Sequence, residues 1–176
     1  MKNAAKNLLV DRLEAPAGAP FTAILAVVDD DLLCALDFAG FESRMHALLA
    51  RRYSNYRLVE RRDPAGVTER LRAYFSGEIG AVDGIPVRTG GTPFQSAAWL
   101  ALRTIPGGTT ATYSEQAGRV GRPAAVRAIG AANGKNPVAI VLPCHRVIGS
   151  NGGLTGYAGG LATKAWLLAH EAAHAS

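Results

Sequence analysis

The residues best suited to chemistry are a cysteine and a histidine that stand side by side, Cys144 and His145, directly after Pro143. A cysteine acts as a nucleophile in its thiolate form, and an imidazole is a common base for removing the proton. The five apolar residues at 138–142 predict a buried strand that delivers Cys144 to a turn at its end. The pair alone says little, because a free cysteine is most often an inert, packed thiol.

Composition narrows the class of protein. A chain of 176 residues that is 48% hydrophobic and 19% charged predicts one or two domains with their own cores and excludes a disordered chain. No apolar run approaches the about 18 residues of a membrane span, and Asp11 and Glu14 stand where a signal peptide is apolar. We therefore expect a cytoplasmic protein with no membrane contact. Two cysteines are too few for a disulfide framework or a Cys-rich zinc site, so we expect reduced thiols and no metal.

Positive charge is concentrated in the second half of the chain. Residues 1–89 hold twelve Lys or Arg and twelve Asp or Glu, whereas residues 90–176 hold seven Lys or Arg and two Asp or Glu. The excess of five positive charges makes residues 90–176 the candidate for contact with a polyanion. A basic surface that serves only solubility explains the charge equally well.

The first half predicts a small α/β (α+β) domain over residues 1–89. Apolar extended segments predict a small antiparallel sheet, with three aspartates at 29–31 as the turn of a hairpin. Strands are expected at 8–15, 21–28, 32–38 and 56–62. Helical spacing predicts helices over 41–53 and 64–75, the second with Asp63 as its N-cap and Pro64 in its first turn.

The second half predicts a mostly helical domain over residues 90–176, after a Gly- and Pro-rich linker at 77–94. Helices are expected at 94–103, from 113 to about 118–121, and from 123 to 133. The last two are short and joined by a turn with glycine, which is the local pattern of a helix-turn-helix in a winged-helix-like domain. Small residues beside Arg127 make its helix slim enough to enter a groove, although many helix pairs bind nothing.

Three longer motifs resemble one family. The stretch PCHRVIGSNGGLTGYAGGLATKAWLLAHE resembles the active-site signature of the O6-alkylguanine-DNA alkyltransferases, the methylated-DNA–protein-cysteine methyltransferases. GTPFQSAAWLALRTIPGGTTATYSEQA resembles the family's opening helix and the segment after it, and RAIGAANGKNP resembles its recognition helix and asparagine turn. The resemblance covers residues 90–172. The first half is similar to the family only in size and strand-helix order, and it lacks a Cys and His cluster for zinc.

The resemblance implies direct repair of O6-alkylguanine, and of O4-alkylthymine, by irreversible transfer of the alkyl group to Cys144, once per molecule and without a cofactor. An ordinary thiol, with a pKa of about 8.5, supplies little thiolate at neutral pH. By resemblance, His145 removes the proton through a water, Glu171 orients and charges His145, and Asn136 braces the turn. Tyr113 is the expected donor of a proton to O6 as guanine leaves.

The resemblance also implies that the partner is double-stranded DNA carrying the alkylated base. A base must leave the stack to reach a thiol inside a protein, and Arg127 is the residue expected to fill the gap, from a helix in the minor groove. An ordinary phosphate contact is the alternative role for Arg127. The other expected DNA contacts are Thr92, Tyr113, Arg119, Arg122, Ala128, Gly130 and Ala132.

The expected substrate pocket is lined by Val147, Tyr157, Ala158, Gly159 and Lys164. The carbonyls of Cys144 and Val147 are expected to accept from the guanine amino group, and the backbone N–H of Ala158 to face O6. Many relatives have Ser at the Ala158 position, so we expect an altered preference for substrates or inhibitors without loss of activity.

Two other functions stay open at this point. A non-catalytic lesion-binding module or transcription regulator would use the same helix pair without chemistry, and a Cys/His hydrolase would need an acyl pocket for which the sequence offers no support. We expect a monomer. The preferred alkyl groups, the choice between O6-guanine and O4-thymine, cooperative loading on DNA and the role of the first half are left open. Cys34 is expected to be a small core residue.

Overall fold

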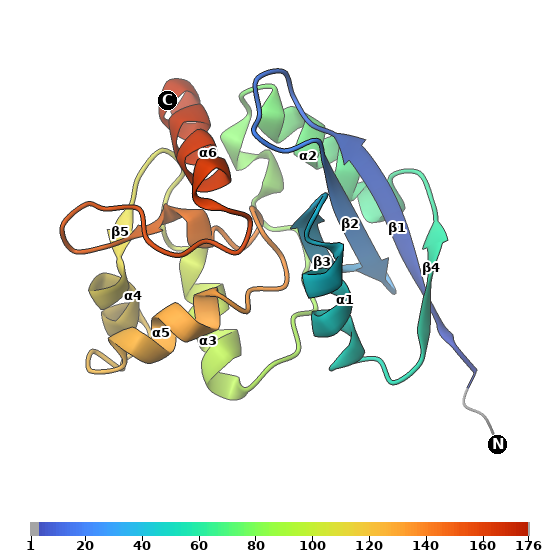
Figure 1. Ribbon diagram of the computed structural model, residues 1–176, viewed down its shortest axis with the longest axis horizontal. Helices are drawn as coiled ribbons and strands as arrows, with labels where there is room; N and C mark the ends of the chain where they lie inside the picture. The colour runs from blue at the N-terminus through green and yellow to red at the C-terminus, as the bar shows by residue number, and fades with distance from the viewer. Residues whose placement is uncertain (1–3, 176) are drawn as a thin grey trace.

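The computed structural model describes residues 4–175 and shows a four-stranded sheet in the first half of the chain (Figure 1). The strands are β1 (Lys6–Glu14), β2 (Ala23–Asp29), β3 (Leu32–Phe38) and β4 (Tyr56–Glu60). They lie in the order β3-β2-β1-β4. β2 pairs antiparallel with β1 and with β3, whereas β1 and β4 run parallel. The sheet is therefore mixed, and the prediction of an antiparallel sheet is wrong.

The connections explain this mixture of directions. Asp30 and Asp31 join β2 to β3 with left-handed backbone, at φ 46° and 62°, which a two-residue hairpin turn needs. Parallel strands instead need a crossover, and α1 (Glu42–Ala50) carries the chain from β3 at one edge of the sheet to β4 at the other. Met45 and Leu49 of α1 are buried in the same apolar cluster as residues of β1, β2 and β3.

Helix α2 (Val67–Phe75) begins three residues later than predicted. Pro64–Gly66 form a separate 3-10 turn in which Ala65 has a φ of 55°, and left-handed backbone cannot continue a right-handed helix. Asp63 still serves the helix from a distance, because its Oδ1 accepts the backbone N–H of Glu69 at 3.0 Å. Gly66, and not Asp63, is the N-cap of α2, so both the predicted cap and the predicted start of the helix are wrong.

The stretch at 77–94 is packed and is not a free linker. It contains a 3-10 turn at Ile79–Val82. It also lies along the edge of β3, where Leu33 donates its N–H to the carbonyl of Pro86 and accepts the N–H of Arg88, each at 2.9 Å. The Gly and Pro content of this stretch predicted a linker whose backbone is hydrated, but pairing with the edge of β3 gives some of its backbone groups partners within the protein.

The second half is mostly helical, as predicted. Its helices are α3 (Pro93–Leu102), α4 (Tyr113–Arg119), α5 (Val126–Asn133) and α6 (Leu161–His174), and its short parallel strands are β5 (Ala111–Thr112) and β6 (Val147–Ile148). Capping boxes start α3 at Thr92 and α4 at Thr112. α5 begins at Val126, after the turn that follows Pro123, and not at Pro123 itself.

One apolar core joins the two halves. Its buried residues include Phe38 and Leu71 from the first half and Trp99 and Leu167 from the second. In Figure 1, α6 stands beside α2, while α3, α4 and α5 lie together on the side away from β1 and β4. The junction of the halves is therefore where segments distant in sequence meet, and Cys144 packs against this core.

Candidate active site

The segment that leads to Cys144 is buried but is not a strand. Only Val138 forms a bridge, with Leu36 on the edge of β3, and Ile140 then turns the chain with a left-handed φ of 67°. The N–H of Leu142 closes this turn on the carbonyl of Val138 at 3.1 Å. The apolar run therefore predicted burial correctly and the strand wrongly. Cys144 begins a 3-10 turn, Cys144–Arg146, at the end of this segment.

The side-chain amide of Asn136 is fixed toward the sulfur. Its Nδ2 donates to the carbonyl of Leu142 at 2.7 Å and contacts Sγ of Cys144 at 3.2 Å, while its Oδ1 accepts the N–H of Val138 at 2.9 Å. Because both ends of the amide are engaged, the N–H has one orientation. An N–H aimed at sulfur stabilises the thiolate more than the thiol.

Cys144 is nevertheless a protonated thiol in the free protein. Burial raises the pKa of Cys144, and this outweighs the opposing effects of Asn136 and of the positive charges of Arg44 and Lys164. The residue is partly exposed, so a substrate can reach it. A base is needed to generate the nucleophile at neutral pH.

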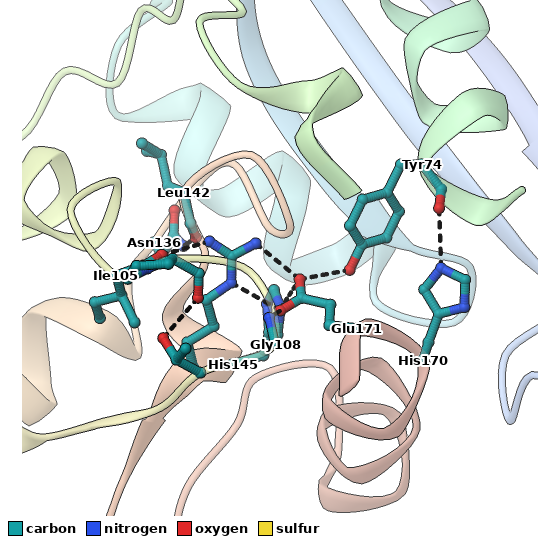
Figure 2. Close-up of polar contacts among 11 residues, drawn as sticks. Tyr74, Ile105, Gly108, Asn136, Leu142, His145, His170 and Glu171 are labelled. Carbon is teal, nitrogen blue, oxygen red and sulfur yellow. Dashed lines mark hydrogen bonds and ion pairs between the residues drawn. The ribbon is translucent and has the colours of Figure 1, made fainter. Parts of the chain in front are cut away.

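The base is positioned by a buried carboxylate that accepts five hydrogen bonds (Figure 2). Glu171 Oε1 accepts from His145 Nε2 at 2.8 Å and from Tyr74 at 2.8 Å. Arg146 donates to both carboxylate oxygens, at 2.8 and 2.9 Å, and the N–H of Gly108 to Oε2 at 3.3 Å. Burial opposes ionisation, but the hydrogen bonds from His145 and Arg146 hold the pKa of Glu171 well below its usual range.

His145 is held as a neutral ring with one basic nitrogen. Burial lowers the pKa of His145 by more than the bond to Glu171 raises it. Because Nε2 donates to the carboxylate, the neutral ring carries its lone pair on Nδ1, which has no hydrogen-bond partner among the described residues. Glu171 therefore orients the ring, and the lowered pKa of His145 favours the neutral form in the free protein.

Two residues expected to bind the substrate, Tyr113 and Lys164, already donate hydrogen bonds to the loop at 149–160. Tyr113 donates its hydroxyl to the carbonyl of Thr155 at 3.1 Å. Lys164 is fully buried and donates to the carbonyls of Val147 and Thr155 at 2.5 and 3.1 Å. A carbonyl oxygen has two lone pairs, so that of Val147 can still accept a second donor. Tyr113 has to leave Thr155 before it can donate to a substrate.

Position 159, in the pocket wall beside Tyr157, has no room for a side chain. A Cβ on Gly159 would lie 2.7 Å from the ring of Phe38 and 2.9 Å from that of Tyr157, so only glycine fits. The hydroxyl of Tyr157 is buried without a hydrogen-bond partner among the described residues. Burial raises the pKa of Tyr157, and a thiolate at Cys144 raises it further. Ala158 between them is partly exposed.

The expected DNA contacts divide into surface and buried residues. Arg127, Ala128 and Arg122 are exposed, and Gly130 is partly exposed. Ala132 faces inward, at 2% exposure, and its carbonyl accepts Nε1–H of Trp99 at 2.8 Å, so its side chain is unable to line a DNA surface.

The hydroxyl groups near this surface already have partners. Thr92 uses its hydroxyl to cap α3. Arg119 is exposed, and its Nη1 donates to the hydroxyl of Thr104 at 2.7 Å.

α4 and α5 are held together by two hydrogen bonds between the side-chain amides of Gln116 and Asn133, at 2.7 and 3.1 Å.

Three functional candidates escaped the sequence reasoning: Arg44, Tyr74 and Arg146. Arg146 lies within a recognised motif, but its partner Glu171 is 25 positions away. Arg44 and Tyr74 belong to the first half and reach the site only in the folded molecule. Nothing in their local sequence distinguishes them from other arginines and tyrosines of amphipathic helices.

A metal cluster and a membrane-spanning helix are both absent from the part of the chain that the structure describes. No group of three or more His, Cys, Asp or Glu side chains there could hold a metal ion. No helix there is long and apolar enough to cross a membrane.

A partly exposed thiol followed by a carboxylate-held imidazole is the arrangement of a protein with an activated cysteine nucleophile. A family model described as "6-O-methylguanine DNA methyltransferase, DNA binding domain" matches residues 93–173. The methylated-DNA–protein-cysteine methyltransferase of Shigella flexneri is 45% identical over 162 residues, which cover 90% of this chain and 95% of the relative. That of Salmonella typhimurium is 46% identical with the same coverage. The chain belongs to the methylated-DNA–protein-cysteine methyltransferase family.

Solved structures agree with this assignment. The crystal structure of Mycobacterium tuberculosis OGT in complex with DNA is 35% identical and superposes with a TM-score of 0.78, over 96% of this chain and 94% of that one. The O6-methylguanine-DNA methyltransferase of Pyrococcus kodakaraensis, at 24% identity and a TM-score of 0.70, shares the fold. The likeness spans both halves, including the first half, whose sequence carried no motif.

Proposed function

We propose that this protein repairs O6-alkylguanine in double-stranded DNA by transferring the alkyl group to Sγ of Cys144. The observation that carries the proposal is a partly exposed Cys144 whose Sγ contacts the amide of Asn136, next to a histidine whose Nδ1 has no hydrogen-bond partner within residues 4–175. The relatives' names support the same activity, since they are methylated-DNA–protein-cysteine methyltransferases. O4-alkylthymine presents a similar alkyl ether and is a second expected substrate.

In the proposed reaction, the S–H proton passes to Nδ1 of His145 through a water. The C–S bond forms as the bond between the alkyl carbon and O6 breaks, and the electron pair of that bond stays on guanine. Tyr113 donates a proton to O6 and regains one from the imidazolium through water. The balance is a thiol and an alkylguanine giving a thioether and guanine. A thioether sulfur is a poor leaving group, so each molecule acts once and no cofactor is required.

Recognition of DNA is assigned to the second half, residues 90–176. α4 and α5 act as a helix-turn-helix of a winged-helix-like domain, with α5 in the minor groove. Arg127, exposed near the start of α5, enters the stack when the base swings out. The first half, residues 1–89, is the amino-terminal domain with its linker, and its role is structural support of the second half. The protein works as a monomer in the cytoplasm, where its thiols stay reduced.

Mass spectrometry tests the reaction directly. After incubation with O6-benzylguanine or a methylated duplex, we expect one added benzyl or methyl group per molecule, on the peptide that contains Cys144. A non-catalytic regulator would show no added mass, and a hydrolase would turn over repeatedly without retaining a group. Either result contradicts the proposal.

The role of Arg127 has its own test. Arg127→Ala should slow repair of a methylated duplex about a hundredfold, because the extruded base is no longer replaced in the stack, while its reaction with free O6-benzylguanine stays unchanged. Arg122→Ala, which removes an exposed arginine from the turn before α5, serves as the control for loss of charge. Equal losses on the duplex and the free base would remove the flipping role from Arg127.

A further inference from the structure

The first half of the chain contacts the proposed catalytic relay at two points. One contact reaches the asparagine beside the sulfur, and the other reaches the carboxylate behind the histidine. Both donors come from helices of the first half, Arg44 from α1 and Tyr74 from α2. The sequence offered no role for either residue.

Arg44 bridges the sheet domain and the asparagine turn. Its Nη1 donates to the carboxylate of Asp37 at 2.6 Å, and its Nη2 donates to the carbonyls of Asn136 and Gly134 at 2.8 and 3.1 Å. Asp37 is 2% exposed, so the guanidinium is anchored at a buried carboxylate. A planar guanidinium can hold three acceptors in fixed directions, which an ammonium on a flexible stem cannot do.

The edge of β3 holds the same turn by its backbone. The N–H of Leu36 donates to the carbonyl of Pro137 at 2.9 Å, and the carbonyl of Leu36 accepts the N–H of Ala139 at 3.0 Å. Asn136 is thus fixed by Arg44 on its own carbonyl and by β3 on the residues that follow. Since the amide of Asn136 contacts Sγ of Cys144, the first half holds the backbone from which that N–H is directed, while Leu142 and Val138 hold the amide itself.

Arg44 also contributes charge at the sulfur. The charged and titratable groups around Cys144 are His145 from the same turn, Arg44 from α1, Lys164 from α6 and Tyr157 from the loop at 149–160. The positive charges of Arg44 and Lys164 favour the thiolate, against the burial that raises the pKa of Cys144. Lys164 belongs to the second half, so Arg44 is the cationic contribution of the first half to the reacting atom.

Tyr74 acts on the opposite end of the relay. It is fully buried and donates its hydroxyl to Oε1 of Glu171 at 2.8 Å, the same oxygen that accepts from His145 (Figure 2). Burial and the charge of Glu171 raise the pKa of Tyr74, so it remains a donor. Each additional donor on this oxygen weakens its pull on an imidazolium and fixes the direction of the carboxylate.

We propose that Arg44 and Tyr74 are positioning residues through which the first half holds the two ends of the relay, Asn136 beside the sulfur and Glu171 behind the imidazole. Neither touches the substrate. The proposal rests on the proposed transfer to Cys144 and gives the first half a part in the reaction beyond structural support.

The test uses the full chain and free O6-benzylguanine, so that DNA binding does not enter. Cys34→Ala removes the second thiol from every protein, and the Cys144 titration is followed by the ultraviolet absorbance of the thiolate. Arg44→Met and Arg44→Lys are compared with Arg51→Met, which removes an exposed arginine just beyond α1. Tyr74→Phe is compared with Tyr56→Phe, which also loses a hydroxyl hydrogen bond, to His46. Thermal unfolding is recorded for all variants.

We expect Arg44→Met to react about tenfold more slowly at neutral pH, with the Cys144 titration midpoint about half a unit to one unit higher. Arg44→Lys should restore most of the midpoint but not the full rate, because it keeps the charge and loses the bridge. Tyr74→Phe should react about threefold more slowly and move the acid limb of the pH–rate profile upward, since Glu171 then favours the imidazolium more. Arg51→Met and Tyr56→Phe should match the parent.

Three results overturn the proposal. The first is an Arg44→Met protein whose rate and midpoint equal those of Arg51→Met. The second is a rate loss that follows the loss of thermal stability alone, with the midpoint unmoved. The third is a Tyr74→Phe protein with an unchanged acid limb. If Arg44→Met does not fold, Arg44→Gln replaces it, because a neutral amide keeps one donor and tests the same midpoint. A parent that fails to react with O6-benzylguanine overturns the transfer itself, a different outcome.

Discussion

Cys34 and Cys144 are both thiols whose pKa is raised by burial, yet their surroundings differ. Cys34 lies on β3, fully buried beside Met45 and Leu49, and the nearby Arg52 and Tyr53 only partly offset the effect of burial on its pKa. Cys144 is partly exposed at the start of a turn, with an amide N–H at its sulfur and an imidazole next in sequence. Burial is therefore common to both, and access together with a nearby base separates them. A raised pKa is not a mark of an inert thiol when a base stands beside it.

The largest effect is expected when the sulfur of Cys144 is replaced. Cys144→Ser should abolish alkyl transfer, because a hydroxyl is far less nucleophilic than a thiolate, and should leave DNA binding intact. Cys34→Ala should transfer at the parent rate. Intact-protein mass after incubation with O6-benzylguanine measures both, and an adduct on the Cys34 peptide would contradict the distinction between the two thiols.

A second prediction removes the charge behind the imidazole. Glu171→Gln leaves the buried guanidinium of Arg146 without its carboxylate, and breaking a buried ion pair in this way costs about 3 kcal/mol of unfolding free energy. We also expect transfer to slow strongly, because the imidazolium that forms when His145 takes the thiol proton loses the negative charge behind it. Urea unfolding and the transfer rate are measured on the same protein. Asp63→Asn, which alters the side chain that accepts the N–H of Glu69 in the first half, provides a control that should change stability slightly and the rate not at all.

The pH dependence of the reaction rate should differ between Cys144, which has a base beside it, and Cys34. The pKa of His145 is lowered in the folded protein, so the ring is neutral above its ordinary value of about 6.5 and gains a proton only below it. The transfer rate should therefore be level through neutral pH and fall only at acid pH. In Cys144→Ser protein, the remaining thiol, Cys34, should react with a small thiol reagent only slowly, and faster as alkali rises. A transfer rate that already falls at neutral pH would mean that His145 has a raised pKa.

The smallest expected effect concerns the pocket wall. Ala158→Ser adds a hydroxyl beside the backbone N–H expected to face O6, and should change the relative rates on methyl, ethyl and benzyl groups about threefold without loss of transfer. Rates measured with each alkylguanine report the change. Identical rates on all three groups would show that the residue at 158 does not contribute to selectivity.

The elements that sequence predicted well are those fixed by local patterns. The hairpin at 29–31, the starts of α3 and α4 to within one residue, and the burial of 138–142 depend on residue type and spacing. The parallel pairing of β1 with β4 and the path of the chain at 138–142 depend on distant segments. Alternation and apolar runs do not encode partners, so both were predicted wrongly.

By itself the sequence determined which residues could react, since Cys144, His145, Asn136 and Glu171 stand in motifs whose order and spacing resemble one family. Only the tertiary structure decided how they act. Glu171 is shared with Arg146 and Tyr74, and Asn136 is held by Arg44 and by the edge of β3. The physical reason is that proton affinity depends on the charges and donors within a few ångströms of a group, and here those neighbours come from helices and strands far apart along the chain.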